Sequence, residues 1–212
     1  MSYVLEVNPP LLGTGDAPAP FTGDVVDDDG DAADLSSFDG AVFVLRAPDG
    51  EEMLAGPAPI DQPTSTITYD LAEGDFDAPG LWQVTTKLVN GTTPTLTLST
   101  FPIVVEALDG WTSLATARDQ WRDAPADDAL LWRLLNVARD QVTDFAPEPL
   151  PEPIPDRYAF AQLTQARNLW NATKSDPANA AIGDDGLLLR PFPLDWTVKR
   201  MIRPVRAKPV IA

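Results

Sequence analysis

This sequence contains neither cysteine nor histidine, so its carboxylates are the side chains most able to bind a metal ion or to act in acid–base chemistry. The densest group of them is a run of aspartates: Asp24, Asp27, Asp28, Asp29, Asp31 and Asp34. Such a run could supply oxygen ligands to Ca²⁺, but an EF-hand loop starting at Asp27 needs glycine at its sixth position and glutamate at its twelfth. Ala32 and Phe38 occupy those positions. We therefore expect a solvated loop at 24–34, with a looser Ca²⁺ site between strands as the alternative.

The residue types missing from the chain exclude most catalytic chemistry. Without cysteine and histidine there is no thiol nucleophile, no imidazole base and no Cys/His zinc site. The adjacent acids Asp127/Asp128 and Asp184/Asp185 are typical of a helix start and of a solvated loop. No glycine-rich loop of the phosphate-binding kind occurs. We expect a protein that is not an enzyme and needs no cofactor.

The C-terminal end carries a charge opposite to that of the whole chain. The net charge is −17, yet no acid follows Asp195. The bases after it are Lys199, Arg200, Arg203, Arg206 and Lys208. A cationic end on an acidic protein predicts a partner with a complementary surface. Together with Trp196, Val210 and Ile211, these bases form the predicted binding set.

Charge and hydrophobic period both change near residue 109. Residues 1–110 hold 19 acids and only two bases, Arg46 and Lys87, whereas residues 111–212 hold 13 of each. The alternation typical of strands gives way there to helical spacing. We therefore predict an α+β protein with a domain at 1–108, a second at 109–203 and an extended arm at 204–212. The start resembles no signal peptide, and no apolar run is long enough to span a membrane.

The first domain reads as short strands separated by turn residues. Alternating or apolar segments occur at 3–7, 21–26, 41–46, 51–55, 67–71, 82–88 and 96–105. Pro48-Asp49-Gly50 and Asn90-Gly91 supply the turns that hairpins require. About seven short strands with this spacing predict an antiparallel β-sandwich of immunoglobulin type.

The second domain reads as four helices. The first begins after Thr112 as N-cap and has Leu114, Ala117 and Trp121 on one face. The second starts at Asp127 and Asp128, where negative charge favours a helix start. Its apolar stripe is Leu131, Leu134, Leu135, Ala138, Val142 and Phe145. The third helix begins near Asp156 and is predicted to bury Ala159, Leu163, Ala166 and Trp170. The fourth spans 194–203, with Leu194, Val198 and Met201 inward.

Two features of this second domain point beyond its own core. Trp111 and Trp132 lie at the flanks of the predicted helices and are candidates for contacts between subunits, although Trp132 fits a core edge equally well. Residues 146–155 have proline at every second position, which excludes helix. We expect a polyproline II spacer there.

Several stretches of the second half resemble the head-to-tail adaptors, or head–tail connectors, of long-tailed bacteriophages. The resemblance lies at 111–123, 127–135, 154–170 and 192–204, the last being similar to versions from phages of actinobacteria. The first half resembles the immunoglobulin-like module of phage structural proteins, through 78–82 and the Asn90-Gly91 turn.

The resemblance implies a structural virion protein of the phage neck. Its helical bundle would assemble into a ring of twelve copies that binds the portal protein on one side and a stopper or tail-completion protein on the other. Genomic DNA would pass through the lumen without specific binding. The protein would be made in the host cytoplasm. Smaller adaptors lack the acidic domain, and we expect it to lie outside the ring.

Two other functions fit parts of the sequence. The immunoglobulin-like half alone would suit a cell-surface or carbohydrate-binding module, although that role leaves the helical half unused. The basic end could bind DNA phosphates directly, but the acidic domain beside it would repel them. Glycan binding by residues 1–108, or a strongly salt-dependent affinity for DNA, would favour these alternatives.

Overall fold

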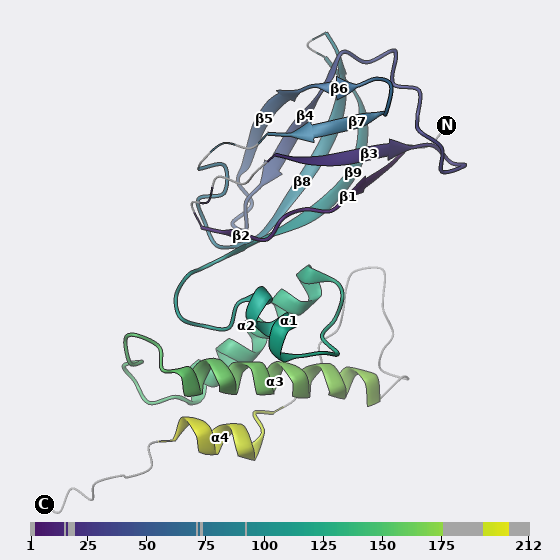
Figure 1. Ribbon diagram of the computed structural model, residues 1–212. Helices are drawn as coiled ribbons and strands as arrows, with labels where there is room; N and C mark the ends of the chain where they lie inside the picture. The colour runs from purple at the N-terminus through teal and green to yellow at the C-terminus, as the bar shows by residue number, and fades with distance from the viewer. Residues whose placement is uncertain are drawn as a thin grey trace, which may run out of the picture. The chain divides into compact units, whose positions relative to one another are not determined.

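The computed structural model describes residues 3–14, 16, 20–70, 72, 74–91, 93–175 and 193–203 (Figure 1). The chain divides into two compact units, 1–107 and 108–212. Within the described residues the first unit holds two β-sheets and the second holds four helices, so the protein is α+β. Each unit is described by itself below.

The strands of the first unit form a four-stranded and a five-stranded sheet. The four-stranded sheet has the order β1 (Val4–Val7), β3 (Phe21–Val26), β7 (Thr66–Tyr69), β6 (Ile60–Asp61). The five-stranded sheet has the order β2 (Leu12–Gly13), β9 (Thr93–Glu106), β8 (Gly80–Asn90), β4 (Gly40–Arg46), β5 (Glu52–Ala58). Only the β2–β9 pair is parallel among these strands. The seven predicted strand segments all contain strand, and the short strands β2 and β6 were not predicted.

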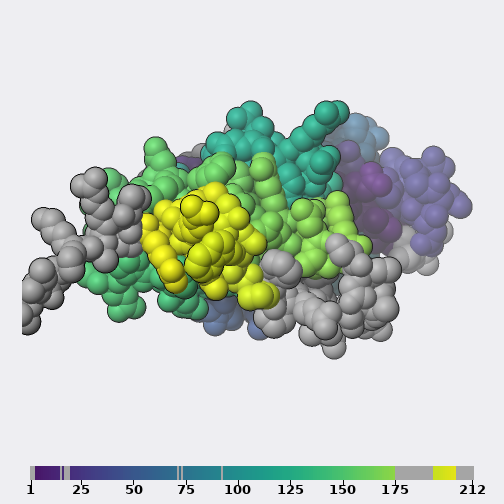
Figure 2. Space-filling model, turned by 90° about the horizontal axis from the view of Figure 1, so that it is seen from below, coloured from purple at the N-terminus to yellow at the C-terminus, as the bar shows by residue number. Residues whose placement is uncertain are grey.

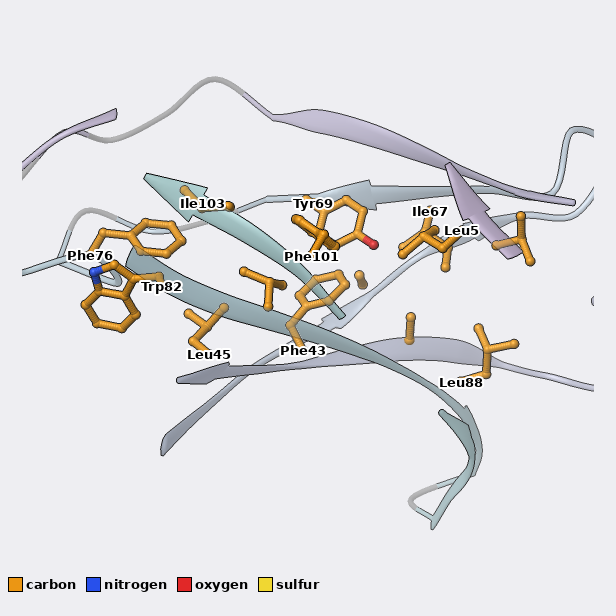
Figure 3. Close-up of a cluster of buried hydrophobic side chains, with 14 of the residues drawn as sticks. Leu5, Phe43, Leu45, Ile67, Tyr69, Phe76, Trp82, Leu88, Phe101 and Ile103 are labelled. Atoms are coloured by element: carbon orange, nitrogen blue, oxygen red, sulfur yellow. The ribbon is translucent and has the colours of Figure 1, made fainter. Parts of the chain in front are cut away.

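One hydrophobic core joins the two sheets, and aromatic rings make up its centre (Figure 3). The ring of Tyr69 on β7 stacks on Phe43 of β4, with the ring centroids 4.3 Å apart. Its hydroxyl shares a 2.8 Å hydrogen bond with the Thr86 hydroxyl on β8. Burial raises the pKa of Tyr69 to about 12 because the phenolate would lose its hydration. At one end of the core, Trp82 meets Phe76 edge to face at 5.1 Å. Tyr69 therefore ties the sheets together through both a stack and a hydrogen bond.

The aspartate-rich loop is ordered by its own backbone. The Asp27 carboxylate accepts hydrogen bonds from the N–H groups of Asp29 and Asp31, at 2.9 and 3.1 Å. An isolated bridge between Val26 and Ala32 closes the loop behind them. Asp27 therefore stabilises the conformation of the loop through side-chain to backbone hydrogen bonds, as asparagine and aspartate do in turns.

The second unit contains helices α1 (Leu114–Gln120), α2 (Asp128–Phe145), α3 (Asp156–Ser175) and α4 (Trp196–Ile202). Asp127 caps α2 as the sequence predicts, accepting from the N–H of Leu130. The predicted cap of α1 is wrong: Ser113, not Thr112, accepts from the N–H of Thr116. Thr112 instead donates its hydroxyl to the Ala159 carbonyl of α3, at 2.8 Å. Of the two adjacent hydroxyl residues, Thr112 therefore bonds to a distant helix and Ser113 caps α1.

The apolar stripe of α2 is confirmed, whereas the predicted buried face of α3 is partly wrong. Leu131, Leu134, Leu135, Ala138 and Val142 are all buried. On α3 the predicted Ala159 and Trp170 are only half-buried. The buried positions of α3 are Tyr158, Ala161, Gln162, Leu163, Gln165, Ala166 and Leu169. The reason is that α3 packs against both α2 and α4. Its buried face is therefore wider than a single apolar stripe and is centred on different residues than predicted.

The proline-rich segment 146–155 contains neither helix nor strand, as its prolines predict. Its predicted role as a spacer is wrong, because Leu150 and Ile154 pack on the same core as Val142 and Tyr158. The segment is therefore a closing loop between α2 and α3, held against the helical unit by two apolar side chains.

Candidate interaction surface on the helical unit

Helix α4 is the element that positions the cationic residues, and its start is fixed by two hydrogen bonds. The Asp195 carboxylate accepts from the N–H of Thr197 at 2.7 Å, and this bond lowers the pKa of Asp195. A lowered carboxyl pKa means that the cap is ionised and intact at neutral pH, and is lost only in acid, below the ordinary value of 3.8. The Asp195 N–H donates to the side-chain oxygen of Gln165 on α3, at 3.3 Å.

The inner side of α4 is apolar and anchors the helix. Val198 and Ile202 are completely buried against Val142, Tyr158 and Ala161. The spacing of four residues places both on one side of the helix. Figure 2 shows α4, in yellow, at the surface of the helical unit over the green helix α3. Burial of these two side chains therefore fixes which residues of α4 face outward.

The outer side of α4 carries a cluster of cations and aromatic rings, which we call the α4 surface: Phe145, Trp196, Lys199, Arg200 and Arg203. The Lys199 ammonium lies 5.4 Å from the Phe145 ring centroid. The Arg203 guanidinium lies 5.2 Å from Phe145 and 5.5 Å from Trp196. Trp196 remains 62% exposed. Contacts of this kind hold cations over ring faces and contribute about 0.5–1 kcal/mol each at exposed sites.

Part of the predicted binding set thus comes together on one surface. Trp196, Lys199, Arg200 and Arg203 all lie on α4 or at its end. Arg206, Lys208, Val210 and Ile211 lie outside the described residues. Lys199 and Arg200 also fall in the last turn of α4, where cations stabilise a helix against its own dipole.

The two tryptophans predicted at subunit contacts differ in their surroundings. Trp111 is half-buried, packs against the helical core and lies 5.1 Å from the guanidinium of Arg139. Arg139 also pairs with Asp109 at 2.7 Å, so the ring of Trp111 is covered within its own chain. Trp132 is half-buried on α2. Both tryptophans are half-buried, and their predicted contacts between subunits stay predictions. Trp111 also contacts residues of its own chain.

Two residues that complete the site were not predicted to belong to it. Phe145 ends the apolar stripe of α2, where the sequence predicts core, but it is half-buried and supports two cations. Gln165 is completely buried, and besides Asp195 it contacts the Gln141 side chain at 2.7 Å. The sequence signal for Gln165 was a glutamine beside the apolar positions Leu163 and Ala166, and the buried Gln162 shows the same pattern.

The chemistry that this surface supports is recognition of an anionic partner through the cationic head groups, with the exposed ring of Trp196 available for apolar contact. Among the described residues, no three acidic side chains come close enough to hold a metal ion. No helix in the described part of the chain is long and apolar enough to cross a membrane. No protein-family model and no curated protein matches the chain.

Proposed function

We propose that this protein is a head-to-tail adaptor of a long-tailed bacteriophage, a structural virion component that binds the portal protein through the α4 surface. The observation that carries the proposal is the exposed group of Trp196, Arg200 and Arg203 on a helix anchored by Val198 and Ile202. The last two cations of the sequence, Arg206 and Lys208, follow in the arm at 204–212. A rigid surface followed by a cationic arm suits attachment to an acidic or grooved partner face.

The first unit supports the immunoglobulin-like part of the proposal. With β1 as A, β2 as A′, and β3 to β9 as B, C, C′, D, E, F and G, its sheets have the orders A-B-E-D and A′-G-F-C-C′. This arrangement matches the sheets of the immunoglobulin sandwich, including strands B and E on one side and C, F and G on the other. Such a module on a helical adaptor fits a virion protein whose sandwich lies outside the ring.

In this proposal the helical units assemble into a ring, expected to hold twelve copies, with portal above and a stopper or tail-completion protein below. The lumen passes genomic DNA without specific binding. Exposed charge pairs contribute only about 0–1 kcal/mol each. Portal affinity therefore depends mainly on apolar anchors such as Trp196 and on the avidity of many identical contacts.

The experiment is attachment of the purified full chain to portal rings, scored by negative-stain microscopy and sedimentation. We expect the wild type to form rings that decorate portals. Deletion of 204–212, or the double change R200E/R203E, should reduce decoration about tenfold or more. Arg133 is exposed on α2, away from the α4 surface, so R133E is a single charge-reversal control that should attach normally.

Two results would contradict the proposal. One is normal decoration by both the truncated chain and R200E/R203E. The other is a wild-type chain that stays monomeric and ignores portals but binds glycans through residues 1–108, which would favour the cell-surface or carbohydrate-binding function.

A further inference from the structure

The outer face of the five-stranded sheet is distinguished by its charge. The first unit has only two cations, Arg46 on β4 and Lys87 on β8, and both occupy outward positions in their strands. The inward positions between them, such as Phe43 and Val84, are buried in the core. Neither β4 nor β8 contains an acidic residue. Two carboxylates share this face: Glu52 lies opposite Arg46 at one edge, and Glu106 is the last residue of β9, beside β2 at the other edge.

An apolar patch accompanies these cations on the same face. The register places Leu54 opposite Val44, Val44 opposite Thr85, and Thr85 opposite Thr100. Leu54 is 72% exposed and Val44 is half-buried. We call this surface, with Arg46 and Lys87 beside the Leu54–Thr100 row, the cationic face.

The outer face of the four-stranded sheet has the opposite character. The register aligns Glu6 with Asp24, Asp24 with Thr66, and Thr66 with Asp61 across all four strands. All three carboxylates are exposed. Val4, which is 48% exposed, lies two residues along β1 from Glu6. We call this row the acidic face. Because both sheets cover one core, the two faces point to opposite sides of the unit (Figure 1).

Neither face is explained by the stability of the unit itself. Glu6 and Asp24 are like charges placed directly opposite each other, which destabilises a strand pair. The Thr66 hydroxyl donates to Asp24 at 2.9 Å but brings no positive charge. Within the described part of the chain, neither Arg46 nor Lys87 forms an ion pair. The strands of the four-stranded sheet contain no cation, and on the other face Lys87 has only Val42 and Thr97 opposite it, whereas Arg46 has Glu52. The acidic row and Lys87 are therefore the charges that a second molecule would balance.

From this complementarity we infer that the first unit binds a second copy of itself, with the cationic face of one copy against the acidic face of the next. Such a contact is heterologous, since different surfaces meet, and it propagates around a ring or along a filament. Leu54 and Val44 on one face and Val4 on the other supply the apolar contacts, and the charges set orientation. The contact joins the acidic units to one another and is independent of portal binding through α4.

The absence of cysteine from the chain gives a direct test, because introduced thiols are the only ones present. Thr22 on β3 and Thr100 on β9 are exposed positions on the acidic and cationic faces. Full-length T22C and T100C, mixed and treated with a short bismaleimide, should form covalent dimers about tenfold faster than either variant alone. The matched control S36C, on an exposed loop, should not accelerate cross-linking with T100C.

Charge reversal tests the cause of the contact. R46E/K87E on the T100C chain should slow cross-linking to T22C about tenfold, and E6K/D24K on the T22C chain should restore it. Restoration also shows that both variants are folded. The inference is wrong if T22C with T100C reacts no faster than S36C with T100C. It is equally wrong if charge reversal leaves the rate unchanged or if the reciprocal changes fail to restore it.

Discussion

The two units of this chain use charged residues in opposite ways. In the helical unit, cations are part of the packing: Arg118 pairs with Asp128, Arg139 pairs with Asp109, and Arg167 lies 5.8 Å from the Trp121 ring. In the first unit, neither Arg46 nor Lys87 forms an ion pair among the described residues, although Glu52 lies opposite Arg46. Its stability depends instead on an aromatic core between two sheets.

This difference shows which charges are available to partners. Several cations of the helical unit contact acids or rings of the same chain, and four aromatic or cationic residues of α4 and its end lie together on the α4 surface. In the first unit the two cations share one sheet face, and the row of Glu6, Asp24 and Asp61 lies on the other. This difference is the basis on which we propose one binding surface in each unit.

The largest expected effect is the loss of stability of the first unit when a buried core residue is removed, with no change in the helical unit. Trp82 is 1% exposed, and its indole N–H donates to the Ala78 carbonyl at 2.9 Å. W82A should lower the free energy of unfolding of the first unit by about 3–5 kcal/mol, because it removes a large ring and leaves a cavity. In calorimetry the transition of the helical unit should not move. The exposed Trp196 gives the matched control, W196A, with a change within about 0.5 kcal/mol.

A second change tests the polar packing of the helical unit. Gln162 is 2% exposed, donates to the Leu135 carbonyl at 3.0 Å and accepts from the Thr112 N–H at 2.8 Å. Q162A should destabilise this unit by about 2–4 kcal/mol, since it removes the partners of both groups. Urea unfolding followed by far-UV circular dichroism measures the loss. Q120A, at an exposed position of α1, should have no comparable effect.

The third prediction uses alkaline pH to weaken only the first unit. Tyr69 keeps its proton to about pH 12 in the fold, against an ordinary pKa of 10.0. Its stabilising contribution is complete below pH 10 and falls between pH 10 and about 12, by about 2–3 kcal/mol in total. Urea midpoints at pH 8 and pH 11 should show about half of this loss, about 1.4 kcal/mol, in wild type. An equal loss in Y69F, which has no phenol to titrate, would contradict the assignment.

The smallest expected effect is the response of the two melting temperatures to salt, which should differ in sign between the two units. Residues 1–110 hold 19 acids and two bases, so added salt should screen repulsion and raise the midpoint of the first unit. The helical unit should lose part of its ion pairing. Between about 20 and 300 mM NaCl we expect the melting temperature of the first unit to rise by about 2–5 °C. The melting temperature of the helical unit should fall by a smaller amount. If calorimetry shows both transitions shifting in the same direction with salt, the predicted difference between the two units is wrong.

The sequence predicted best where a strong local period coincided with local end signals. The stripe of α2 follows from spacing within one helix, and its start follows from the charge of Asp127 and Asp128. The strand at 41–46 follows from an apolar run, and the strand at 82–88 follows from alternation. The errors came where a distant residue decided the outcome. Thr112 bonds to α3 rather than capping α1, and Leu150 and Ile154 pack on the helical core rather than extending as a spacer.

The candidate sites show the same limit. The cations of α4 were visible in the sequence, but Phe145 beneath them and Gln165 behind them were not, because both depend on how three helices pack. The acidic and cationic faces depend on strand register, which pairs Glu6 with Asp24 and Val44 with Thr85 across long separations in sequence.

By itself, the sequence determined the change of charge near residue 109, the change of hydrophobic period at the same place and most of the elements. Those properties come from neighbouring residues and from composition, which act before the chain folds. Only the tertiary structure decided that Gln162 and Gln165 are buried and that the few cations of the first unit share one face opposite a row of carboxylates. Side chains far apart in sequence become neighbours only through strand pairing and helix packing, so local patterns carry no record of them.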